Sequence, residues 1–128
     1  MPRIPSLRIM AVLVGAALLL WIPFEDDSTR WVRIFSMGIC CLSAIYACTK
    51  IAPEKRLRWY TYPSVGLLAG LLVTPVTIIL MAFKSGLHGH GNPDFTPTQV
   101  SSVLSSWPVW AAAGLLAGLA AAIWQKVR

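Results

Sequence analysis

Four apolar stretches, each about as long as a bilayer-crossing helix, dominate this sequence. They cover residues 7–24, 31–51, 64–83 and 107–124. A hydrocarbon core of about 30 Å requires roughly 20 apolar residues in a helix. Lipid offers the backbone no hydrogen-bond partners, so each such segment must pair its own backbone groups. The sequence therefore predicts an all-α integral membrane protein with four transmembrane helices, arranged as two helical hairpins in a single membrane domain of residues 1–128.

The composition agrees with a membrane location and leaves no room for a separate soluble domain. Hydrophobic residues make up 56% of the 128 residues and charged residues only 12%, against about 25% charged residues in ordinary soluble domains. The formal net charge is +6, but the basic residues flank the apolar stretches and form no patch interleaved with aromatics. We therefore expect lipid headgroups, and no nucleic acid, as their partners.

Basic residues are divided unevenly between the two sides that four spans would create. Eight of the eleven lie around the start of the first span, between the second and third, or after the fourth; Arg30, Arg33 and Lys84 fall in the other two connections. Because Lys and Arg resist translocation, both termini are predicted to be cytoplasmic. No small-x-small cleavage site follows the first apolar stretch, which favours a retained anchor. A bacterial inner (cytoplasmic) membrane is the expected location.

Two pairs of glycines have the GxxxG spacing that brings helix backbones together. Gly66 and Gly70 lie in the third apolar stretch, and Gly114 and Gly118 lie in the fourth. Small residues at this spacing allow close approach of a second helix. We expect these four glycines to make helix contacts, either between the third and fourth spans or with a different protein.

Six tryptophans lie near the ends of the apolar stretches. Their amphipathic rings favour the boundary between lipid and water, so they are predicted to set the depth of the helices. These anchors are Trp21, Trp31, Trp59, Trp107, Trp110 and Trp124.

The longest connection, residues 84–106, is predicted to be an ordered outer loop. Thr96 and Gln99 have the spacing of a capping box, with Pro97 at the first helical position. A short helix over residues 97–104 is therefore expected, lying at the outer membrane interface.

The same loop holds the best candidate for a metal site. His88, His90 and Asp94 could ligate zinc or copper. The alternative is a polar loop in which the glycines form turns and Asp94 caps a helix. Cys40, Cys41 and Cys48 lack a CxxC spacing and are predicted to pack as small apolar residues.

The third apolar stretch contains Pro75 between Thr74 and Thr77, which predicts a kink whose freed carbonyl the threonines could satisfy. A small homo-oligomeric transporter would use these residues to line a break in the helix. No ionisable residue lies near the middle of any span, although transporters usually carry one there.

The function that the sequence favours is that of a non-catalytic subunit. No nucleophile–base set, phosphate-binding loop or haem-attachment motif is present, so no enzyme is predicted. We expect a structural, accessory subunit of a larger membrane complex, bioenergetic in kind (photosynthetic or respiratory), whose partners are lipids and other integral membrane subunits. No cofactor is required, while lipid or pigment could bind at the periphery. The alternatives are a protein that binds a divalent metal or a cofactor through His88, His90 and Asp94, and the small transporter.

Overall fold

The computed structural model describes residues 5–23, 28–51, 58–88 and 94–127, and these contain helices and no strands. The prediction of an all-α chain is confirmed. The helices are α1 (Pro5–Trp21), α2 (Thr29–Ile51), α3 (Thr61–His88), α4 (Pro97–Ser105) and α5 (Trp107–Val127).

Three helical stretches of the described chain are long and apolar enough to cross a membrane. They are Thr29–Lys50, Thr61–Leu87 and Pro97–Val127, the last of which combines α4 and α5. The helix α1 is also apolar but has only 17 residues. By length and composition, the fold is that of a membrane protein.

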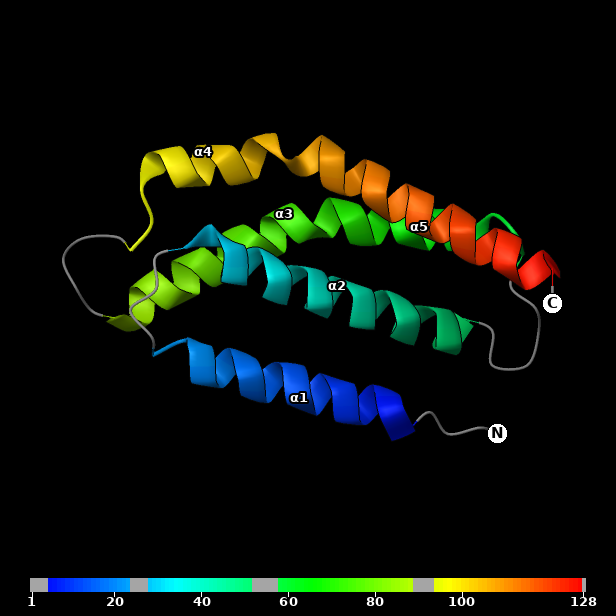
Figure 1. Cartoon of the computed structure of the whole chain (residues 1–128), viewed down its shortest axis with the longest axis horizontal. Coiled ribbons are helices and arrows are strands. Elements are labelled where there is room, and N and C mark those ends of the chain that lie inside the picture. Colours follow the sequence, from blue (N-terminus) through cyan, green and yellow to red (C-terminus); the bar gives the residue numbers. More distant parts are fainter. Residues whose placement is uncertain (1–4, 24–27, 52–57, 89–93, 128) are drawn as a thin grey trace.

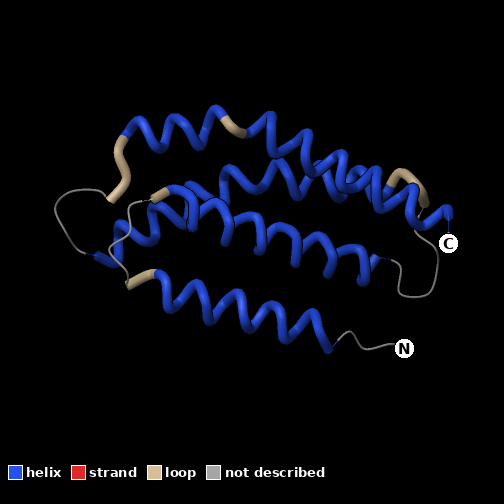
Figure 2. Tube along the Cα trace, viewed as in Figure 1, coloured by secondary structure: helices blue, strands red, loops and turns tan. Residues whose placement is uncertain are grey.

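The long helices lie side by side in the order α1, α2, α3, α5 (Figure 1). The most extensive contact is between α3 and α5, followed by that between α2 and α3, while α1 packs along α2. The helix α3 is therefore the central element of an open row. The start of α1 and the end of α5 lie at the same end of the molecule, as the alternating directions of the helices require (Figures 1 and 2).

Glycines form the contact between α3 and α5. A Cβ atom placed on Gly66 would overlap the carbonyl oxygen of Gly114 and lie 3.0 Å from the Cα atom of Gly118. A Cβ atom on Gly114 would overlap the carbonyl oxygen of Gly66 and lie 3.0 Å from the Cα atom of Gly70. The two backbones thus touch where a side chain would otherwise separate them. The structure brings the two predicted GxxxG pairs together within one chain.

The helix α3 is longer than the sequence predicted. It continues to His88, so the expectation that the loop begins at residue 84 is wrong for residues 84–88. The physical reason lies at Lys84, whose side chain is 1% exposed and whose ammonium lies over the ring of Trp21. An aromatic face stabilises a desolvated cation, so the charge does not force the helix to end.

The helix α4 begins with the predicted capping box. The Thr96 hydroxyl accepts a hydrogen bond from the Gln99 N–H (3.3 Å), and the Gln99 side-chain oxygen accepts one from the Thr96 N–H (2.7 Å). These bonds satisfy two backbone donors at the start of the helix.

The course of α4 differs from the expected interfacial helix. Val103 is buried and Val100 is partly buried against the core, together with Phe95. The helix ends at its C-cap Ser106, and the chain leads into α5 in the same general direction (Figures 1 and 2). The helix therefore extends α5 and packs against α3, whereas a separate helix along the outer membrane surface was predicted.

We expect Gly114→Ala to lower the free energy of unfolding by about 1–3 kcal/mol, because the new methyl group meets backbone that cannot rotate away. The matched control is Gly15→Ala in α1, where a Cβ atom would meet nothing within 4 Å. This control should leave stability unchanged or raise it slightly. Unfolding by denaturing detergent, followed by circular dichroism, measures both. Equal effects of the two substitutions would contradict the glycine contact.

Candidate functional site

The predicted metal ligands are only partly within the described chain. His88 is the last residue of α3, Asp94 lies just before α4, and His90 falls outside the described residues. The described part of the chain contains no group of three His, Cys, Asp or Glu residues that could hold a metal ion.

A groove on the surface of α3 could receive another molecule. It has a volume of about 740 Å³ and lies between α2 and α5, which flank α3. Its walls are formed by residues between Met37 and Thr49, between Tyr62 and Val73, and between Trp110 and Ala121. Most of these side chains are small and apolar, so the groove suits an apolar occupant.

The three cysteines all line this groove. Cys40 is buried, Cys41 is exposed, Cys48 is partly buried, and all three are free thiols. All three lie on α2 between Met37 and Thr49, the part of the helix that lines the groove.

At the opposite end of the molecule, Lys84 lies among apolar side chains from three helices. Its ammonium nitrogen is 3.9 Å from the centroid of the Trp21 ring, and this ring lies 5.5 Å from that of Phe35. Val32 and Met81 belong to the same buried cluster. A cation over an indole face is stabilised most strongly where water is excluded. The pair therefore joins the end of α1 to the end of α3.

A second cation at this end connects α2 to α4. The guanidinium of Arg33 donates a hydrogen bond to the Ser102 hydroxyl at 3.2 Å. The Nε atom of Arg33 and the indole N–H of Trp21 are buried without a hydrogen-bond partner among the described residues. Both cations in this region serve to connect helices.

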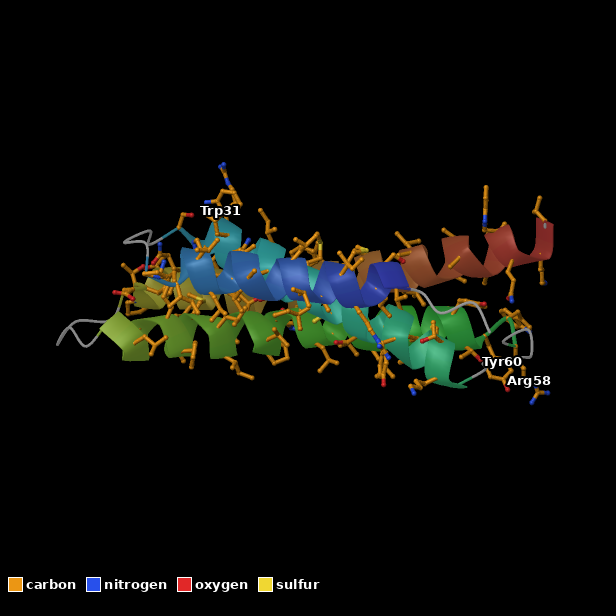
Figure 3. The ribbon with its side chains drawn as sticks, turned by 90° about the horizontal axis from the view of Figure 1, so that it is seen from below. Trp31, Arg58 and Tyr60 are labelled. Carbon is orange, nitrogen blue, oxygen red and sulfur yellow. The ribbon has the colours of Figure 1, made fainter. Side chains whose placement is uncertain are left out.

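The predicted tryptophan anchors differ in their burial. Trp31, Trp59, Trp107 and Trp124 are exposed, and Trp31 lies at the end of the molecule opposite to Arg58 and Tyr60 (Figure 3). Trp110 is partly buried and its carbonyl group meets Gly70. Trp21 is buried, so its ring packs inside the protein.

The residues proposed for a transporter do not form a break in α3, which is helical through Pro75. The Thr77 hydroxyl donates to the carbonyl of Val73 at 2.7 Å, whereas proline removes the bond to the carbonyl of Leu71. The threonine therefore does not satisfy the freed group as predicted. The hydroxyl of Thr74 is buried and has no partner among the described residues.

Sequence reasoning missed the Trp21–Lys84 pair. The only sequence signal for this pair was that both residues were expected near the outer membrane surface. Nothing in the local pattern of either helix shows that the two ends meet, because α1 and α3 are far apart in the sequence.

Comparison with known proteins finds no matching family model, no similar curated protein and no similar solved structure.

A double-mutant cycle on Trp21→Leu and Lys84→Met should give a coupling free energy of about 2 kcal/mol, since the buried pair is shielded from water. The exposed pair Trp59 and Lys126, with 5.8 Å between ammonium and ring centroid, provides the matched control and should couple more weakly. Detergent unfolding of the four chains of each cycle gives the values. A coupling of zero for the buried pair would show that the contact does not stabilise the protein.

Proposed function

We propose that this chain crosses the membrane four times and has both termini in the cytoplasm of a bacterial cell, in the inner membrane. Three helices have the length and apolar character of spans. At 1.5 Å per residue, the 17 residues of α1 extend about 26 Å, close to the lower limit for a span. The distribution of basic residues supports this orientation, since eight of eleven fall on the side of the two termini.

The proposed function is that of a non-catalytic, accessory subunit of a larger integral membrane complex. The observation that carries this proposal is the position of α1 at the edge of the row. This helix packs along α2 through a narrow seam, in which Val14 reaches Gly38 with a distance of 3.9 Å from a Cβ position on the glycine. Away from this seam and from Trp21, the surface of α1 beyond Arg8 is mostly apolar and exposed, including Val12, Leu13 and Leu19.

The exposed surface of α1 has a feature that suits a partner helix. Ala11 is exposed, and Gly15, one turn later, is half-buried with nothing within 4 Å of its Cβ position. Two such small residues four apart permit the close backbone approach that drives helix association in lipid. The two GxxxG pairs are already engaged between α3 and α5. We therefore place the contact with a partner subunit at Ala11 and Gly15.

The expectation of a bioenergetic complex, photosynthetic or respiratory, is part of this proposal. A small subunit of this kind would stabilise its complex by packing against the transmembrane helix of a larger subunit. The interfacial tryptophans would hold it at the matching depth.

Replacing Gly15 with Ile should release the protein from its complex during purification in mild detergent, because the branched side chain separates the two backbones. Gly86→Ile is the matched control, since Gly86 also has nothing within 4 Å of a Cβ position but lies in α3. Affinity purification of each tagged chain, followed by mass spectrometry of what travels with it, measures the effect. Unchanged co-purification of the Gly15→Ile chain would contradict the proposed contact.

A further inference from the structure

The groove between α2 and α5 is about as long, measured along the helices, as one lipid leaflet is thick. On α2, its lining extends from Met37 to Thr49, and on α5 from Trp110 to Ala121. At 1.5 Å per residue, each of these segments is about 17 Å long. One half of a bilayer core is about 15 Å thick. A partner helix that crossed the whole membrane would need roughly twice this length, so the groove matches a lipid chain better than a helix.

Three cations lie at the helix ends beyond one end of the groove. Lys50 follows Thr49 on α2, Arg58 precedes α3 by three residues, and Lys126 lies in the last turn of α5. These helix ends come together at one end of the molecule (Figure 1), where Arg58 projects beside Tyr60 (Figure 3). All three cations are exposed.

Each of these three cations lies over an aromatic ring. Lys50 lies over Tyr46, Arg58 over Tyr60 and Lys126 over Trp59, with 5.3–5.8 Å between charge and ring centroid. None of the three is paired with a carboxylate in the described part of the chain. Their charges thus remain available to an anion at the mouth of the groove.

We propose that this groove binds an anionic phospholipid of the leaflet at the basic end. One of its acyl chains lies along α3 between α2 and α5, and its phosphate contacts Lys50, Arg58 and Lys126. Basic residues beside a pocket between transmembrane helices on the cytoplasmic side attract anionic headgroups. The inference requires the membrane placement proposed above, but it does not depend on the accessory role.

The headgroup determines which lipid is preferred. An acyl chain leaves one apolar environment, the bilayer, for another, so its burial alone gives little selectivity. Each basic residue near the surface favours an anionic lipid. Three of them should give a preference of roughly tenfold or more for an anionic over a zwitterionic lipid with the same chains.

The test uses the full chain in nanodiscs that contain equal amounts of phosphatidylglycerol and phosphatidylcholine with identical acyl chains. Native mass spectrometry counts the lipids that remain on the released protein. We expect one phosphatidylglycerol to be retained at least about tenfold more often than phosphatidylcholine. Substitution of Lys50, Arg58 and Lys126 by Gln should abolish this preference, whereas Arg30→Gln, at the opposite end, should preserve it.

A second variant tests the groove itself. Ala117 is exposed and lines the groove, so Ala117→Phe should fill it and reduce retention of both lipids. Gly15→Ile, on the far edge of the row, should keep the lipid and lose the partner. Ala117→Phe should instead lose the lipid and keep the partner. The two variants therefore distinguish failure of the lipid site from failure of the accessory role.

Three outcomes would overturn the inference. They are equal retention of the two lipids, an unchanged preference in the chain without the three cations, and a dimer of this chain, or a complex with a partner protein, that Ala117→Phe dissociates. The last outcome would assign the groove to a protein.

Discussion

Contact between the backbones of α3 and α5 is the interaction on which the rest of the structure depends. Gly66 and Gly114 each leave space for the carbonyl group of the other helix, and Gly70 and Gly118 continue the contact in both directions. Without a hydrophobic force between helices in lipid, close packing of this kind is what holds them together. Because α5 approaches one side of α3 so closely, α2 can occupy the other, and the groove forms between them.

The cations have different surroundings at the two ends of the row of helices. At one end, Lys84 is enclosed by Trp21 and the apolar cluster, and Arg33 bonds to Ser102, so charge joins helices to each other. At the other end, the cations lie exposed over aromatic rings, where they can meet lipid. The first arrangement stabilises the fold, and the second supports the proposed lipid site.

Much of the fold could be predicted from local patterns. Apolar runs predicted the helices. The spacing of Gly66 with Gly70 and of Gly114 with Gly118 predicted that each pair contacts another helix, either in this chain or in a different protein. Thr96 and Gln99 specified the start of α4, since a capping box depends only on neighbouring residues. The choice between a contact inside the chain and one with another protein required the positions of both helices.

Features that depend on packing could not be predicted in this way. The extension of α3 through Lys84 depends on a ring in α1. The groove is formed by small residues on three helices, such as Ala44, Ala69 and Ala117. In the sequence of each helix alone, these residues cannot be told from ordinary lipid-facing positions. The direction of α4 follows from the burial of Val103 and Phe95 against other helices.

Solid-state NMR of the chain in lipid bilayers, with ¹³C only in its nine glycines, tests the central contact most directly. We predict cross-peaks between Gly66 and Gly114 whose intensity per labelled molecule is unchanged when labelled protein is diluted with unlabelled protein, since the contact lies within one chain. Cross-peaks that disappear on dilution would place the contact between copies, and their complete absence would contradict it altogether.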